Sequence, residues 1–327
     1  MSSKSDVNIA IIGSGAMGSL FAGYLSSVAN VFLFGNWPEQ IEALQQQGLT
    51  IIQPSGDHQL IQLNATNDLA EMPPADFALI LVKGFQTARA ARQAANIIRA
   101  QGLALTLQNG LGNLEKLAEA VGQERAALGI TAQGATVIGP GRLRHAGTGA
   151  TYLGGTANQL EKLTQLAGLL TAAGLETILA DHVDSLVWGK LAINAGINPL
   201  TALLEIPNGV LAENDRLRQV MSAAATEVAR VAAAQGIDLP FADAAARTVE
   251  VSRATATNRS SMLQDISRRA PTEINAITGE VVRIGKQLGI PTPVNQLLLD
   301  LVRAKERGRA VDLQQLQLAN LALAFRT

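Results

Sequence analysis

The stretch Val7-Asn8-Ile9-Ala10-Ile11-Ile12-Gly13-Ser14-Gly15-Ala16-Met17-Gly18 decides the fold of this chain. It combines an apolar run of strand length with the turn pattern G-x-G-x-x-G, and residues 19–25 continue with helical spacing. In such a unit the glycines permit a tight turn, the approach of a pyrophosphate and close packing of helix on strand. The helix N-terminus adds N–H groups and partial positive charge. The sequence therefore predicts a dinucleotide-binding site formed by Gly13, Ser14, Gly15, Ala16, Met17 and Gly18.

The alternation of strands and helices continues after this unit. Apolar runs predict strands over residues 30–34, 75–82 and 103–107, and residues 87–100 have the spacing of a helix. Short Gly- and Thr-rich pieces in 134–155 predict antiparallel strands that extend the sheet. This pattern is typical of a doubly wound, Rossmann-type α/β sheet, whose ligands bind outside the C-terminal ends of the strands.

Three polar residues follow predicted strands and are candidates for cofactor binding: Asn36, Lys83 and Asn109. Lys83 can equally be a solvated charge at a strand end, and Asn109 can be a turn residue before Gly110. The position after the second strand usually holds an acid for NAD or an Arg for NADP. Here Asn36 and Trp37 occupy that place, and no Lys or Arg occurs from Ser5 to Val82. The choice between NADP and NAD stays open on these grounds, with Lys83 as one source of positive charge.

The second half of the chain has a different pattern. From about His182 the strand signals vanish, and stretches with helical spacing cover residues 223–234, 243–256, 272–288 and 295–305. Gly and Pro residues interrupt these stretches where helices should end. We therefore expect a Rossmann-type domain over residues 1–181 and an all-helical domain over residues 182–327.

A row of polar residues crosses an apolar part of that helical half. Lys190, Asn194 and Asn198 stand four positions apart among Leu, Ala and Ile residues, so they share one side of a helix. Burying an ammonium and two amides without partners costs several kcal/mol, roughly 1–3 for each uncharged group. The row therefore indicates a ligand site. Pro199 disfavours helical geometry at the preceding residue, and we expect the helix to bend or end at Asn198.

Composition excludes several classes of protein. The chain has 327 residues, 47% of them hydrophobic and 16% charged, which describes a folded globular protein. A net charge of −1 provides no basic surface for nucleic acid, and three scattered His with no Cys offer no metal site. The N-terminus resembles neither a signal peptide nor a membrane span. We expect a cytoplasmic protein with a small-molecule partner and neither metal, nucleic acid nor membrane, and a homodimer is left open.

Two further polar residues lie at predicted helix starts. Ser261 lies between helical segments, and Glu273 begins the helix after Pro271. Each has a plain structural explanation, because Ser is a common helix cap and a carboxylate is favourable in a first helical turn.

Together these pieces resemble the ketopantoate reductase (2-dehydropantoate 2-reductase) family over nearly the whole chain. The glycine turn is shared with many dehydrogenases. The specific segments are Lys190-Leu191-Ala192-Ile193-Asn194 with Asn198-Pro199-Leu200-Thr201, Pro207-Asn208-Gly209, and Ser260-Ser261-Met262-Leu263-Gln264-Asp265 with Thr272-Glu273-Ile274.

The resemblance implies reduction of 2-dehydropantoate to (R)-pantoate with NADPH, a step towards pantothenate and coenzyme A. It implies that Lys190 is the general acid, that Glu273 assists catalysis, and that the substrate is held by Asn194, Asn198, Asn208 and Ser261. Asn109 would lie beside the nicotinamide, and Lys83 would contact the cofactor. Asn36 departs from the Arg that many members have, so NAD is also considered. Two alternatives are a reductase of another branched 2-oxo acid and a non-catalytic NAD(P)-binding redox sensor.

Overall fold

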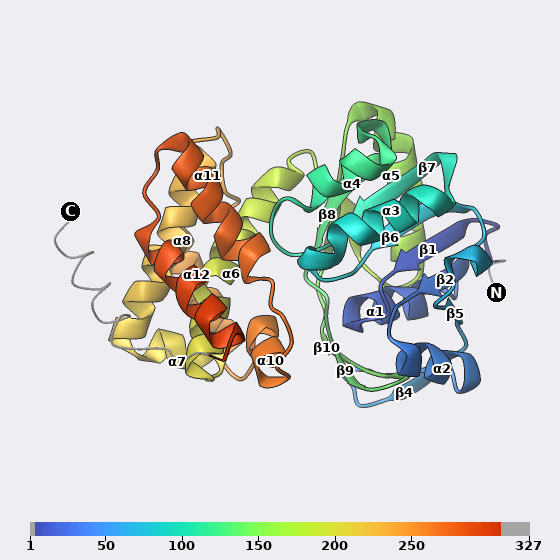
Figure 1. Ribbon diagram of the computed structural model, residues 1–327, viewed down its shortest axis with the longest axis horizontal. Helices are drawn as coiled ribbons and strands as arrows, with labels where there is room; N and C mark the ends of the chain where they lie inside the picture. Colours follow the sequence, from blue (N-terminus) through green and yellow to red (C-terminus); the bar gives the residue numbers. More distant parts are fainter. Residues whose placement is uncertain (1–3, 309–327) are drawn as a thin grey trace. The chain divides into compact units, whose positions relative to one another are not determined.

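The computed structural model describes residues 4–308, which fall into two compact units (Figure 1). Unit 1 comprises residues 1–108 and 112–183, and unit 2 comprises residues 109–111 and 184–327. The domain boundary expected after residue 181 stays a prediction. Residues 1–3 and 309–327, at the outer ends of the two expected domains, are outside the described residues.

Unit 1 is built on an eight-stranded sheet with the order β12-β11-β8-β7-β6-β1-β2-β5. Six adjacent strands of this sheet are parallel to one another: β8, β7, β6, β1, β2 and β5. Strand β11 runs antiparallel to β8. The strands are β1 (Asn8–Ile12), β2 (Asn30–Phe34), β5 (Asn64–Thr66), β6 (Ala75–Ile80), β7 (Ile98–Thr106), β8 (Ala126–Thr131), β11 (Thr151–Gly154) and β12 (Thr177–Leu179). The predicted α/β class is confirmed.

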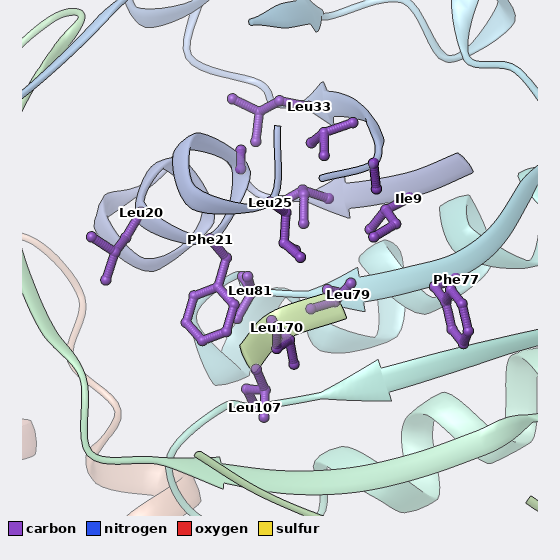
Figure 2. Close-up of a cluster of buried hydrophobic side chains, with 14 of the residues drawn as sticks. Ile9, Leu20, Phe21, Leu25, Leu33, Phe77, Leu79, Leu81, Leu107 and Leu170 are labelled. Atoms are coloured by element: carbon purple, nitrogen blue, oxygen red, sulfur yellow. The ribbon is translucent and has the colours of Figure 1, made fainter. Parts of the chain in front are cut away.

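Helices cover both faces of this sheet because successive strand residues point to opposite sides. Ile9 and Ile11 of β1 join the core beneath α1 (Ala16–Leu25) and α5 (Leu160–Ala172). Figure 2 shows this cluster, in which Phe21 and Leu25 of α1 lie toward strand residues such as Ile9 and Leu79. Ala10 and Ile12 join the opposite core with α3 (Thr87–Ile97) and α4 (Asn113–Val121). Further elements are α2 (Pro38–Gln46) and the 3-10 helices η1 (Leu69–Glu71), η2 (Gly84–Gln86), η3 (Gln123–Arg125) and η4 (Ala157–Gln159).

A second sheet corrects one expectation. Only β11 of the strands in 134–155 extends the main sheet; β9 (Gly134–Gly139) and β10 (Arg142–Gly147) pair with β3 (Leu49–Ile52) and β4 (His58–Ile61) in the order β4-β3-β10-β9. Helix α1 supplies the reason, since Gly23 packs so closely on this sheet that a Cβ there would lie 2.8 Å from Ile51 Cδ1. The small sheet thus buries the outer side of the helix that follows the glycine turn.

The helix predicted over residues 87–100 ends three residues early. Ile98 takes an extended conformation and pairs with Ala75, so β7 begins there. Arg99 also forms an ion pair with Asp76 at 2.6 Å. Strand pairing at a distance along the chain overrides the helical spacing of residues 94–98.

Unit 2 is helical throughout its described part, as predicted. Its elements are α6 (Val183–Leu204), α7 (Asn208–Glu213), α8 (Asp215–Ala233), α9 (Ala244–Ala254), α10 (Ser261–Ser267), the π-helix η5 (Asn275–Gly279), α11 (Glu280–Leu288) and α12 (Pro293–Glu306). Their apolar faces share one core, which contains Trp188 and Leu191 of α6 and Met221 and Val228 of α8. Across residues 4–308, none of the helices has both the length and the hydropathy that crossing a bilayer requires.

Helix α6 corrects part of a second expectation: the helix does not end at Asn198, and the bend there stays a prediction. The helix neither stops nor leaves helical geometry at Asn198, but continues through Pro199 to Leu204. Pro199 removes one backbone hydrogen bond from the helix. The residues around it, from Ile197 to Leu203, are buried in the core of the unit. Tertiary packing supplies most of the stability of a protein helix, and here it outweighs the proline.

Candidate active site

In the glycine turn of unit 1, Gly13 and Gly18 are packed closely against the backbone, whereas Gly15 faces open space. Gly13 has a φ of +125°, and a Cβ there would lie 2.6 Å from the carbonyl oxygen of Leu81. A Cβ on Gly18 would lie 1.7 Å from the Gly13 oxygen, so helix and turn are in direct contact. Gly15 precedes the first residue of α1 and is exposed, and a Cβ there would meet nothing within 4 Å. The three positions have the properties that a pyrophosphate cradle requires.

The helix start beside this cradle is also suited to an anion. Ala16 and Met17 begin α1 and are partly exposed, whereas Ser14 is buried. The first turn of α1 contains no acidic residue. The free N–H groups of a helix start therefore face no competing carboxylate from that turn.

The end of β2 adjoins the same turn. A Cβ on Gly35 would lie 2.1 Å from Ser14 Oγ, so the strand end packs on the cradle. Asn36 and Trp37 follow and are exposed, Trp37 by 37%. Neither carries a charge, which leaves the ribose position without the side chain that usually distinguishes NAD from NADP.

Lys83 follows β6 in a segment that touches the cradle. Val82 Cγ1 would lie 3.0 Å from a Cβ on Gly13, and Lys83 itself is partly exposed. Gln108, to which the sequence pattern gave no role, holds this segment: its Nε2 donates to Val82 O at 2.7 Å and to Thr87 Oγ1 at 2.8 Å. Gln108 immediately precedes Asn109, so its position after a strand was the available signal.

In unit 2, Lys190 and Glu273 interact electrostatically. Lys190 lies on α6 between the buried residues Gly189 and Leu191, and Glu273 lies just before the helical segment that contains η5 and is 7% exposed. Burial lowers the pKa of Lys190 from 10.5 to about 8, and the nearby Glu273 carboxylate opposes this shift. The pair therefore offers a proton donor whose pKa is close to neutral pH.

Asn109 belongs with this pair. Its Nδ2 donates to Glu273 Oε2 at 3.2 Å, and the following residues pack on η5. Gly110 has a φ of +83°, and a Cβ there would lie 2.4 Å from Ala276 O. The Leu111 N–H donates to the same oxygen at 2.9 Å. The structure thus places Asn109 against a catalytic candidate, and its predicted position beside a nicotinamide stays a prediction.

Asn194 and Asn198 lie one and two turns beyond Lys190 on α6. Asn198 is only 6% exposed, and Asn194 is half-buried. Within residues 4–308 neither side-chain amide makes a hydrogen bond. Buried amides are normally hydrogen-bonded, so Asn198 in particular is suited to a ligand.

The two remaining candidates occupy different surroundings. Ser261 is exposed at the first residue of α10, and the cap of that helix is its neighbour Ser260, whose Oγ accepts from Leu263 N. The capping explanation considered for Ser261 is therefore wrong. Asn208 is 7% exposed and joins α7 to α9, because its Nδ2 donates to Thr255 Oγ1 at 2.9 Å. Its Oδ1 is buried without a hydrogen-bond partner among the described residues.

This set of groups can hold and protonate a small oxygen-rich anion. An ammonium can stabilise or protonate a developing alkoxide, and amides and hydroxyls can bind a carboxylate. Within residues 4–308, no three His, Asp or Glu side chains are placed to hold a metal ion together.

Comparison with known proteins agrees with this chemistry. The model of the family described as ketopantoate reductase PanE/ApbA matches residues 9–158, and the model of its C-terminal part matches residues 182–306. The chain is 34% identical to a 2-dehydropantoate 2-reductase of Halobacterium salinarum over 92% of this chain and 99% of that protein. It is 35% identical to one of Pyrococcus abyssi, over 92% and 98%.

Solved structures show the same likeness. A PanE/ApbA family ketopantoate reductase from Ralstonia eutropha JMP134 superimposes with a TM-score of 0.85 and 31% identity, over 92% of this chain and 99% of that one. D-mandelate dehydrogenase in complex with NADH and anilino(oxo)acetate gives a TM-score of 0.86 and 26% identity over the same shares. The two family models together, and each relative by itself, cover most of the sequence, and the chain belongs to the ketopantoate reductase family.

Proposed function

We propose that this protein reduces 2-dehydropantoate to (R)-pantoate by hydride transfer from NADPH, in pantothenate and coenzyme A biosynthesis. The observation that carries the proposal is the pairing of Lys190, with a pKa of about 8, and the buried Glu273 in a chain of this family. When bound, the nicotinamide supplies a hydride to C2 of the 2-oxo acid.

Lys190 acts as the general acid. The oxygen on C2 gains negative charge as C2 is reduced, and Lys190 Nζ donates a proton to that oxygen. With a pKa of about 8, the amine is mostly protonated at neutral pH and gives up its proton more readily than an exposed lysine. Glu273 keeps the charged, donating form populated, since its carboxylate raises the pKa that burial lowers.

Polar side chains of unit 2 bind the rest of the substrate. Asn194, Asn198 and Ser261 present amides and a hydroxyl that suit its carboxylate and its hydroxyl group. Asn208 contributes its unpaired buried Oδ1 as a hydrogen-bond acceptor. Asn109, through its hydrogen bond, orients the Glu273 carboxylate.

The cofactor is held by unit 1. Gly13, Ser14, Gly15, Ala16, Met17 and Gly18 form the pyrophosphate cradle, and Asn36 and Lys83 lie at strand ends next to it. NADPH is preferred in this proposal because the place that usually holds an acid for NAD is taken by Asn36 and Trp37, which do not repel a 2′-phosphate. Lys83 supplies the positive charge.

Initial rates test function and cofactor choice together. NADPH and NADH are compared at equal concentration with 2-dehydropantoate, and NADPH is expected to give the higher kcat/KM. Absence of turnover with both cofactors would refute the reaction. A clear preference for NADH would retain the reaction and assign Asn36 and Trp37 to NAD.

A second candidate is an NADH-dependent reductase of another 2-oxo acid. The likeness to D-mandelate dehydrogenase with NADH, together with the uncharged Asn36, favours this alternative. Its chemistry needs the same Lys190, and only the pocket around the substrate's side group would differ. Comparison of kcat/KM for 2-dehydropantoate, 2-oxoisovalerate and phenylglyoxylate separates the candidates. The highest value with either of the last two would displace the primary proposal.

A further inference from the structure

Two buried hydroxyls join α6 to the start of α10. Thr201 Oγ1 and Ser260 Oγ lie 2.7 Å apart, and the two residues are 0% and 7% exposed. Thr201 is one helical turn beyond Asn198, and Ser260 immediately precedes Ser261. Each hydroxyl is therefore adjacent to a residue that binds the substrate in the proposed function, while neither has a part in that proposal.

The surrounding groups determine the direction of each hydrogen bond. The Leu263 N–H donates to Ser260 Oγ at 3.1 Å. Thr201 donates its only hydroxyl hydrogen to the carbonyl oxygens of Ile197 and Asn198, both at 3.0 Å. Either hydroxyl could donate across the 2.7 Å contact, and the assignment in which both hydroxyl hydrogens find an acceptor makes Ser260 the donor to Thr201. A continuous relay of donors runs from the first turn of α10 through both hydroxyls to the backbone of α6.

The relay reaches α6 at the carbonyl oxygens of Ile197 and Asn198, next to Pro199. Pro199 has no N–H, so the turn that contains Asn198 lacks one backbone bond. Ser260 alone would cap α10, and Thr201 alone would satisfy its hydroxyl within α6. Of these hydrogen bonds, the one between Thr201 and Ser260 joins the two helices, and its burial makes loss of either partner costly.

We propose that Thr201 and Ser260 are positioning residues that hold Asn198 and Ser261 in the mutual arrangement needed to bind one substrate molecule. The inference rests on the proposed function, which makes Asn198 and Ser261 substrate ligands. Neither Thr201 nor Ser260 touches the substrate in this account.

Thr201→Val tests the relay, because it keeps the shape and removes the hydroxyl. Its matched control is Thr248→Val, since Thr248 is also 0% exposed but bonds only to Ala244 O of its own helix. We expect Thr201→Val to lower kcat/KM for 2-dehydropantoate about tenfold, mainly through KM, with an unchanged Kd for NADPH. Thr248→Val should leave kcat/KM and the Kd for NADPH within about twofold of the wild-type values. Thr201→Ser keeps the hydroxyl and should restore kcat/KM.

Hydrogen exchange tests the same relay without substrate. The Leu263 amide should exchange faster in Thr201→Val and at the wild-type rate in Thr248→Val. If Thr201→Val does not fold, Thr201→Ala replaces it, since it also removes the hydroxyl and leaves Ser260 Oγ to accept from the Leu263 N–H. Equal exchange and equal KM in the relay variant and the control overturn the inference. A wild-type protein that fails to reduce 2-dehydropantoate refutes the proposed function instead, and the Leu263 exchange still decides whether the relay exists.

Discussion

In the proposed function, unit 1 binds the cofactor and unit 2 binds the substrate by opposite means. In unit 1 the cradle is made of backbone, and its space exists because Gly13, Gly15 and Gly18 have no side chains. In unit 2 the functional groups are side chains drawn from several segments: Lys190 and Asn198 from α6, Ser261 from α10, and Asn109 with Glu273. The cradle should therefore fail when an atom is added, and the side-chain cluster when one is removed.

Removal of the Lys190 amine should have the largest effect. Lys190→Ala is expected to lower kcat by about 10³-fold, because general acid catalysis contributes on that order. The Kd for NADPH, measured by fluorescence titration, should stay near the wild-type value because the cradle lies in unit 1. Lys286→Ala, which removes an exposed amine of α11, is the control. Wild-type turnover in Lys190→Ala would exclude the acid role.

Adding a methyl group at Gly15 should weaken cofactor binding, whereas adding one at Gly18 should lower the stability of the fold. Gly15→Ala points its methyl into open space, so the fold should tolerate it, but the methyl occupies the approach of the pyrophosphate. Loss of one charged hydrogen bond, about 1.5–3 kcal/mol, predicts a Kd for NADPH roughly 10- to 100-fold weaker.

Gly18→Ala is the counterpart with the opposite expectation. Its methyl would meet Gly13 O at 1.7 Å, so thermal unfolding of the free protein should occur at a lower temperature. Overpacking of this kind costs about 1–3 kcal/mol or more. Equal melting temperatures for Gly15→Ala and Gly18→Ala would contradict the assignment of the two glycines.

The same contrast explains what the sequence could predict. The cradle is a run of consecutive residues, so its elements and even the bounds of β2, Asn30–Phe34, follow from local pattern. The small sheet does not, because β3 and β10 lie far apart in the chain and pair through contacts that periodicity cannot reveal. For the same reason β7 begins at Ile98 inside a predicted helix.

In unit 2, residue types were easier to predict than their contacts. The row of polar residues on α6 follows from the apolar neighbours and the helical spacing alone. The helix end expected at Asn198 was wrong because Pro199 was weighed without the core that surrounds it. The bond between Asn109 and Glu273 spans 164 positions, and no local signal marks it.

The pH dependence of kcat/KM should report the pKa of Lys190 and the effect of Glu273 on it. The proton donor must carry its proton, so kcat/KM should be constant below the Lys190 pKa of about 8 and fall as pH rises through it. Glu273→Gln removes the carboxylate that raises this pKa, so the decline should begin at a lower pH. At pH 8 the variant should be slower by about fivefold if the pKa falls by one unit. A pH profile identical to that of wild type would show that Glu273 does not act through Lys190.

The smallest effect should come from Asn36, a side chain of unit 1 that lies at the expected ribose position. Asn36 follows β2 and is exposed, so an Arg there would meet a 2′-phosphate at the protein surface rather than in a buried site. Exposed ion pairs contribute about 0.2–1 kcal/mol, which predicts that Asn36→Arg improves kcat/KM for NADPH relative to NADH by at most about fivefold. The gain should shrink when rates are measured in high salt, because screening weakens an exposed pair. Asn36→Gln, which lengthens the side chain without charge, should leave the ratio unchanged. A gain of several hundredfold in Asn36→Arg would mean that side-chain charge governs cofactor binding in unit 1 as it governs catalysis in unit 2, and the contrast between the units would not hold.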